Sequence, residues 1–391
     1  MREAVVVSAV RSPMTKYRGA LAPVPVPKLG GYIMQAAVDK VGLDPALIDD
    51  VVFGNLIGHQ WGDAARCCVL ETNFPDSVSA LTVDRQCSSS LNALALGASM
   101  IWGNMADVVL TGGVESYSQA PFLLERPQSA YPGEINFVQY TSSIPGGRGD
   151  GIPMIPTAEN LAKQYNLTRE ECDEFAMQSH HNAAKAAKEG WTKDQIVPIT
   201  LPQRKGDPLV VDADSGIRGD SSMETLGKLR PVMPGGVVTA GNASPQTDGS
   251  SAVLVMSREK AEELGLEILA VVKEFAAAGC DPTIMGIGPV YSTRKLMARH
   301  GYKLDDFDLI ELNEAFAAQS LAVVKELGID RSRLNIEGGA IAIGHPLAAS
   351  GGMLAARMVY ALRRTGKRRG LVTFCCGGGQ GFSLVLENPN A

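Results

Sequence analysis

Two segments, one near each end of the 391-residue chain, carry the same series of features at the same spacing. In the first, an apolar run ends at Asn55, and Cys87 follows 32 residues later, directly before an Ala-rich stretch. In the second, an apolar run ends at Asn313, and His345 follows 32 residues later, again before small residues. Both series close with a further apolar run that ends in glycines, ADVVLTGG and RGLVTFCCGGG. The pattern predicts an internal duplication in which two copies of one strand–helix unit share a centre.

Short runs rich in Val and Ile alternate with longer amphipathic stretches along the chain, which is typical of an α/β fold with sheets buried on both faces. The predicted strands include 4–10, 50–55, 107–113, 308–313 and 370–376. The predicted helices are 28–42, 88–103, 157–165, 168–190, 257–264, 290–300, 314–327 and 350–364. Region 119–250 differs in composition from the flanking parts of the chain, with Pro- and Gly-rich segments at 145–156 and 228–236. It is predicted to be an insertion that covers a site, because long loops on α/β scaffolds commonly bind ligands.

The composition limits the compartment and the partners. Seven cysteines without a framework spacing indicate a reducing compartment, and no apolar run approaches the roughly 20 residues that span a bilayer. We therefore expect a cytoplasmic protein without membrane insertion, although a matrix protein that has lost its transit peptide would have the same composition. The net charge of −6 argues against nucleic acid as a partner. The basic run 363–369 is predicted to be the solvated end of a helix, with a phosphate-bearing ligand as the alternative.

Three side chains set among small residues are the candidates for catalysis: Cys87, His345 and Cys375. Small residues let a substrate come close to the backbone, and a thiol near an imidazole can become the reactive thiolate. Cys87 precedes a predicted helix, whose dipole is expected to lower the pKa of the thiol. Backbone N–H groups in the glycine run after Cys375 can point at an oxyanion. The alternatives are a buried packing cysteine and a turn histidine.

Other reactive side chains give weaker signals. Cys67, Cys68, Cys172 and Cys280 lack a glycine-rich setting and are predicted to be packing residues. No C-x-x-C pair or histidine cluster completes a zinc set, so no metal is predicted. His180 and His181 lie in a charged helical stretch and are predicted to face solvent. No dinucleotide-binding glycine motif or P-loop is present.

The sequence resembles the thiolase family of acetyl-CoA acetyltransferases and 3-ketoacyl-CoA thiolases over nearly its whole length. The motifs that carry the resemblance are the Cys87 segment DRQCSSS, VVVSAVRSP, GGVESYSQAP, TAENLA, LRP, VTAGNAS, NEAFA, GGAIAIGHP and GGGQG. It implies a duplicated thiolase fold in which two similar βαβαβαββ halves form an α/β/α/β/α layered core. The N-terminal half would be 1–118 plus about 251–267, and the C-terminal half 268–391. A loop domain, 119–250, would cover the CoA site, and the chain would form a homodimer or homotetramer.

The resemblance also implies roles for particular residues. Cys87 would be the acylated nucleophile, His345 its base, and Cys375 the group that moves the proton on the α-carbon. Asn313 would hold a water that, with His345, stabilises the thioester enolate, and the backbone of Cys87 and Gly377 would form a second oxyanion hole. Substrate contacts would come from Ser244 at the pantetheine arm, Arg218 at the nucleotide end and Met154, which stands where acetoacetyl-CoA thiolases tend to have His.

The reaction implied is thiolytic cleavage of a 3-ketoacyl-CoA, or the reverse condensation of two acetyl-CoA, with CoA as co-substrate and no prosthetic group. Ping-pong kinetics would follow from an acyl-Cys87 intermediate. Condensing relatives such as ketoacyl synthases lack the second active cysteine, so Cys375 argues against them. A non-catalytic CoA- or lipid-binding protein on the same fold, or a thiolase for an unusual 3-ketoacyl-CoA, are the alternatives.

Some positions depart from the family's usual pattern. Ser90 and Ala348 replace glycines, Glu337 replaces Asn, and Cys376 replaces an apolar residue. These changes concern the choice of acyl group, since the predicted catalytic side chains are all present.

Overall fold

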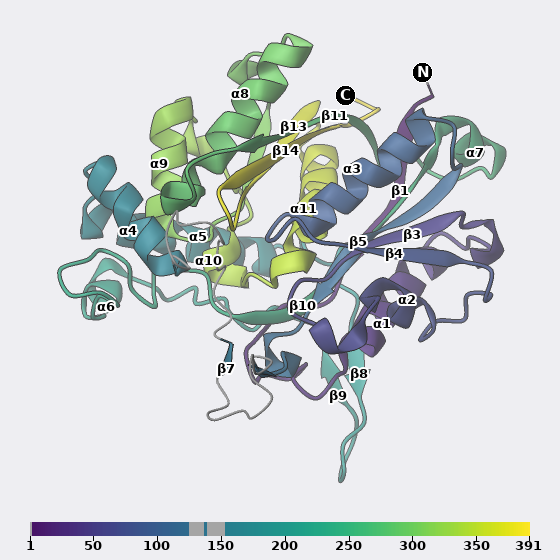
Figure 1. Ribbon diagram of the computed structural model, residues 1–391, viewed down its shortest axis with the longest axis horizontal. Helices are drawn as coiled ribbons and strands as arrows, with labels where there is room; N and C mark the ends of the chain where they lie inside the picture. The colour runs from purple at the N-terminus through teal and green to yellow at the C-terminus, as the bar shows by residue number, and fades with distance from the viewer. Residues whose placement is uncertain (1, 125–136, 139–152) are drawn as a thin grey trace, which may run out of the picture.

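A continuous mixed sheet forms the centre of the molecule (Figure 1), in a computed structural model that describes residues 2–124, 137–138 and 153–391. The strands on the N-terminal side lie in the order β1 (Ala4–Arg11), β10 (Thr247–Ser257), β5 (Val108–Glu115), β3 (Asp50–Gly54) and β4 (Ser79–Val83). Those on the C-terminal side lie in the order β11 (Ala270–Gly279), β14 (Gln380–Glu387), β13 (Arg369–Cys376) and β12 (Leu309–Leu312). The short β2 (Thr15–Lys16) pairs with the start of β10. Antiparallel pairing of β1 with β11 joins the two sides.

The two sides of the sheet repeat one pattern of pairing, which confirms the predicted duplication. β3 runs parallel to β5, as β12 runs parallel to β13. β5 is antiparallel to β10, as β13 is to β14. β1 is antiparallel to β10, as β11 is to β14. Two strands of the N-terminal side, β4 at its outer edge and the short β2, have no counterpart among the described strands of the C-terminal side.

Helices lie in three layers around these strands, and the α/β/α/β/α arrangement is as predicted. The central helices α3 (Ser89–Trp102) and α11 (Ser350–Thr365) contact strands of both halves. Against the outer face of the N-terminal side lie α1 (Val26–Asp39) and α2 (Ala64–Val69). Against the outer face of the C-terminal side lie α8 (Gly288–His300) and α9 (Ala317–Leu327). The central layer therefore receives apolar surface from both sheets.

Small residues allow the two central helices to meet at their first turns. A Cβ atom added at Gly351 of α11 would lie 2.2 Å from the backbone nitrogen of Leu91 in α3. No side chain fits there, so glycine is required for the contact. Since Cys87 and His345 directly precede these helix starts, the contact holds the two halves of the predicted site together.

The segment between the halves contains several shorter elements. They are β6 (Leu123–Leu124), β7 (Phe137–Val138), α4 (Met154–Gln164), α5 (Arg169–Lys188), β8 (Ile199–Leu201), β9 (Leu209–Val211) and α6 (Met223–Gly227). Two further short helices are α7 (Arg258–Glu263) and α10 (Ala340–Ile343). Most of the predicted Pro- and Gly-rich segment 145–156 lies outside the described residues, and the domain limits at 118 and 250 stay a prediction.

Sequence periodicity locates most of the long elements to within a few residues. The start of α9 is three residues later than predicted, because Glu314 turns away into a buried polar cluster. The basic run 363–369 is confirmed as a solvated helix end: it closes α11, and residues 364–368 are exposed. The pattern does not single out β10, β11 and β14, in which apolar runs such as 252–256 are flanked or interrupted by Gly, Ser, Lys or Glu.

Candidate active site

Cys87 lies in the short connection between β4 and α3. Its neighbour Ser88 is the N-cap residue of α3, and Gln86 adopts a left-handed backbone conformation with φ 50°. Such a conformation is costly for a non-glycine residue and is characteristic of functional turns. The turn places the sulfur of Cys87 beside the backbone N–H of Gly377, which follows β13.

Burial dominates the chemistry of the Cys87 thiol. Burial and, more weakly, the neighbouring Cys376 raise the pKa of the thiol to about 12. The backbone N–H groups of Gly377 and of Cys87 itself act in the opposite direction. The lowered pKa expected from the helix start is therefore wrong, since desolvation of a thiolate outweighs the helix dipole. The resting group is a thiol, which needs a base.

His345 lies between α10 and α11 and is buried, which lowers the pKa of its imidazole to about 4. Its Nδ1 lies 2.6 Å from Ser350 Oγ, and that hydroxyl donates its proton to the Pro346 carbonyl at 2.9 Å. Because the hydroxyl has one proton, it accepts from Nδ1–H. The neutral imidazole is therefore fixed with Nε2 unprotonated, the form that a general base requires.

Asn313 directly follows β12 and faces the same imidazole. Its Nδ2 lies 3.3 Å from His345 Nε2, and its backbone N–H donates to Thr373 in the adjacent β13. The Oδ1 atom is buried without a hydrogen-bond partner among the described residues. Buried polar atoms of this kind are often hydrogen-bonded to a water, and the water-holding role of Asn313 stays a prediction.

Cys375 completes the group from the end of β13. It is fully buried, and burial together with the nearby Cys87 and Cys376 raises the pKa of its thiol. The side chain belongs to an apolar cluster with Met285 and Phe316. The structure thus brings the four predicted catalytic side chains and Gly377 to one place, at the ends of β12 and β13 and the starts of α3 and α11.

The three predicted substrate contacts lie on loops and a helix end around this place. Ser244 is half-buried, and both its N–H and its hydroxyl donate to the Ala315 carbonyl at 3.0 Å. Met154 begins α4 and packs against the apolar cluster of Cys375. Arg218 is exposed, and its backbone N–H donates to His180 Nδ1 at 3.2 Å.

The prediction that His180 and His181 face solvent is wrong. His180 is buried under the segment that carries Arg218. Desolvation, together with the charge of Arg218, lowers the pKa of the His180 imidazole to about 4. His181 is half-buried, and its Nε2 lies 2.8 Å from the Ser221 carbonyl. The two histidines therefore attach segment 218–221 to α5. A charged helical pattern cannot show this, because the covering loop is remote in sequence.

The departures from the family's usual residues have identifiable contacts. Ser90 Oγ accepts a hydrogen bond from the Gly352 N–H, which links α3 to the first turn of α11. Cys376 Sγ lies 3.1 Å from Ser88 Oγ. Glu337 is buried and pairs with Arg364 at 2.7 Å. Ser350 and Glu115 are contacts of the site that sequence reasoning missed; the motif GGVESYSQAP contains Glu115, but only its position in the fold reveals its partners.

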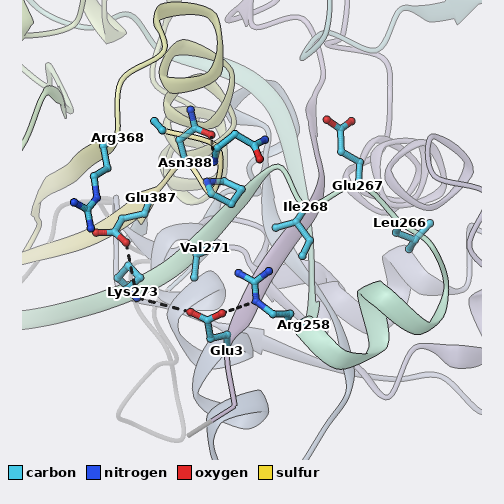
Figure 2. A pocket seen from close by; sticks show the side chains of 13 residues that line it. Glu3, Arg258, Leu266, Glu267, Ile268, Val271, Lys273, Arg368, Glu387 and Asn388 are labelled. Carbon is cyan, nitrogen blue, oxygen red and sulfur yellow. Dashed lines mark hydrogen bonds and ion pairs between the residues drawn. The ribbon is translucent and has the colours of Figure 1, made fainter.

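A pocket of about 510 Å³ lies elsewhere, between the start of β1 and the chain end (Figure 2). Four of its charged side chains are paired with one another: Glu3 with Arg258 at 2.5 Å and with Lys273 at 3.9 Å, and Lys273 with Glu387 at 3.8 Å. Within the described part of the chain, no cluster of three or more His, Cys, Asp or Glu could hold a metal ion. No helix in that same part is long and apolar enough to cross a bilayer.

A duplicated, layered α/β fold with paired cysteines and a buried histidine at its centre defines a class of acyl-transferring enzymes. The thiolase N-terminal domain model matches residues 4–259, and the thiolase C-terminal domain model matches 266–388. The chain belongs to the thiolase family.

Full-length relatives agree with this assignment. An acetyl-CoA acetyltransferase from Chromobacterium violaceum is 42% identical, with 99% of this chain and 100% of that protein covered. The crystal structure of the Bacillus anthracis acetyl-CoA acetyltransferase matches with a TM-score of 0.94 and 41% identity, covering 99% of each chain. That of human mitochondrial 3-ketoacyl-CoA thiolase matches with a TM-score of 0.93 and 36% identity, also covering 99% of each chain.

Proposed function

We propose that the protein transfers an acyl group between Cys87 and CoA, cleaving a 3-ketoacyl-CoA to acetyl-CoA and a shortened acyl-CoA or running the reverse condensation. One observation carries the proposal: Cys87, the Asn313–His345 pair, Cys375 and the Gly377 N–H meet at one centre. Acetyl-CoA is the expected acetyl donor and product, since relatives at about 40% identity are named acetyl-CoA acetyltransferases.

In the first half-reaction, Nε2 of His345 takes the proton of Cys87, and the thiolate attacks the C3 carbonyl of the substrate. Its developing oxyanion receives hydrogen bonds from the backbone N–H groups of Cys87 and Gly377. The C2–C3 bond then breaks, and the electron pair forms the enolate of acetyl-CoA, stabilised by the imidazolium and the water on Asn313. Cys375 donates a proton to C2, and acetyl-CoA leaves.

In the second half-reaction, Cys375 removes the thiol proton of incoming CoA. The CoA thiolate attacks the acyl thioester on Cys87, and the thiolate that leaves recovers its proton from His345. The soft sulfur nucleophile and the low-dielectric site suit thioester exchange. No prosthetic group takes part, and CoA is a co-substrate.

The acyl group is expected to lie against the apolar cluster around Cys375, which includes Met285, Phe316 and the partly buried Met154. We assign Ser244 to the pantetheine arm and the exposed Arg218 to the nucleotide end of CoA. The size of the acyl group is the open variable. A panel of 3-ketoacyl-CoA chain lengths in the cleavage direction ranks the substrates, and degradative use in β-oxidation is expected only if long chains are preferred.

The direct test is acylation of Cys87. Incubation with acetoacetyl-CoA should add one acetyl group to the intact protein, located on Cys87 by peptide mass spectrometry. Iodoacetamide should label Cys87 and abolish cleavage, and substrate should protect. A Cys87→Ala variant that keeps full activity would end the assignment, and an unacylated wild-type protein would favour a CoA-binding role without catalysis.

We further propose a homodimer, able to pair into a homotetramer, in the cytoplasm. Leu81 on the edge strand β4 has a relative exposure of 49%. An exposed strand at the edge of a sheet can pair with the same strand of a second copy. All seven cysteines are free thiols, which fits a reducing compartment. Light scattering measures the assembly, and Leu81→Lys should reduce it to monomers if β4 forms the interface.

A further inference from the structure

Glu115, at the end of β5, is a fully buried carboxylate that the proposed reaction does not use. One oxygen, Oε1, faces three donors of the N-terminal half: the N–H of Ile57 at 3.1 Å, Asn55 Nδ2 at 3.2 Å and the N–H of Leu56 at 3.4 Å. The other, Oε2, accepts the N–H of Ala348 at 3.1 Å. Ala348 lies three residues after His345, so this carboxylate bridges the two halves beside the base.

The segment around Ala348 is packed closely against the same strand. A Cβ added at Gly113 of β5 would lie 2.2 Å from the Ala348 carbonyl oxygen. The next residue, Ala349, accepts a hydrogen bond from Ser251 Oγ in β10. Three residues of the N-terminal half, Glu115, Gly113 and Ser251, therefore contact the backbone after His345.

The duplication gives Glu115 a counterpart. Glu115 lies opposite Gly249 across the β5–β10 pair, and Cys375 lies opposite Gly381 across the β13–β14 pair. Since β5 corresponds to β13 and β10 to β14, the N-terminal half carries a carboxylate where the C-terminal half carries its second cysteine. At this position the C-terminal half holds the thiol of Cys375. The N-terminal half holds Glu115, whose carboxylate faces the segment after His345.

We propose that Glu115 is a positioning residue that fixes the His345 segment, through the Ala348 N–H, against the half that carries Cys87. The proposal rests on the thiolase reaction proposed above. A carboxylate is suited to this place because both of its oxygens face only donors and it is acceptor-only when ionised. A glutamine would turn its NH₂ group toward one of these donor sets, and would release either Ala348 or the loop after β3.

The ionised state of Glu115 also matters. Burial and, more weakly, Asp84 raise the pKa of Glu115, and the N–H groups of Ile57, Ala348 and Leu56 lower it. The net result is a pKa of about 7. The thiol of Cys87 also interacts with this carboxylate. Protonation turns one acceptor into a donor, so kcat should decline below about pH 7. His345 does not produce this limb, since its pKa is about 4.

The test compares Glu115→Gln and Glu115→Asp with Glu311→Gln. Glu311 is a matched control: a buried carboxylate with a pKa raised to about 8, which pairs with Arg357 rather than with the His345 segment. In Glu115→Gln we expect kcat for acetoacetyl-CoA cleavage to fall about 10- to 100-fold, as for loss of one charge-assisted hydrogen bond, with KM changed less than about threefold. The acidic limb near pH 7 should vanish.

Glu115→Asp keeps the charge but is one methylene shorter, so its activity should lie between that of wild type and that of Glu115→Gln, with the acidic limb retained. The inference is overturned if Glu115→Gln keeps kcat within twofold of wild type, or loses no more than Glu311→Gln does. If Glu115→Gln does not fold, Glu115→Asp decides the matter: wild-type kcat with an unchanged pH profile refutes the inference. An inactive wild-type protein would instead contradict the thiolase reaction itself.

Discussion

Removing the hydroxyl of Ser350 tests the argument about the His345 base most directly. Ser350 Oγ accepts a hydrogen bond from His345 Nδ1–H at 2.6 Å and donates one to the Pro346 carbonyl. Ser350→Ala leaves a buried N–H without an acceptor and no longer fixes which nitrogen carries the proton. The structure around the imidazole is otherwise unchanged, since Asn313 and Thr247 keep their contacts with His345.

The size of the effect follows from the burial of the imidazole. An unsatisfied buried donor costs about 1–3 kcal/mol, which corresponds to about 5- to 150-fold in kcat if the loss falls on the transition state. KM for acetoacetyl-CoA should change little, because Ser350 lies on the far side of the imidazole from Nε2. The assay is steady-state cleavage of acetoacetyl-CoA by CoA, together with the rate of Cys87 acetylation in a single turnover.

Ser251→Ala is the matched control. It also removes a buried hydroxyl whose bond goes to this segment, at the Ala349 carbonyl 2.7 Å away, but Ser251 does not touch the imidazole. A Ser350→Ala variant with kcat within twofold of wild type, or one no slower than Ser251→Ala, would refute the reasoning about the tautomer.

Three further predictions concern the surroundings of the site. Asp214→Asn should lower the free energy of unfolding by about 3–5 kcal/mol in urea titrations. The guanidinium of Arg11 is fully buried and lies 2.7 Å from Asp214, and the substitution removes its charge partner. A loss under about 1 kcal/mol would contradict this. His180→Ala should raise KM for acetoacetyl-CoA but not for the pantetheine thioester that lacks the nucleotide, since His180 accepts a hydrogen bond from the backbone N–H of Arg218. An equal rise in KM for both substrates would show a general packing defect. Acidification from about pH 6.5 toward 4 should lower the free energy of unfolding of the wild type by up to about 3 kcal/mol relative to His345→Gln. In this pH range an unfolded histidine binds a proton, whereas the buried His345, with a pKa of about 4, does not. Parallel curves of stability against pH for the two proteins would exclude the effect.

Much of the fold can be predicted from local pattern. The equal 32-residue spacings from Asn55 to Cys87 and from Asn313 to His345 reflect the repeated unit, and the pairing of β3 with β5 matches that of β12 with β13. The central helices are recognisable because their small residues serve the contact at Gly351. Strands such as β10, whose first half is polar and small although it is buried, escape this pattern because their environment comes from neighbours distant in sequence.

Motifs and periodicities within short stretches of sequence are enough to predict the family, the duplicated α/β architecture and the candidate reactive side chains. The protonation and orientation of these side chains depend on the tertiary structure. Burial raises the pKa of Cys87 and lowers that of His345, and Ser350 sets the imidazole's tautomer. The bond from Ala348 to Glu115 joins residues 233 positions apart. Desolvation and such long-range hydrogen bonds arise only when the two halves pack together, so no local pattern contains them.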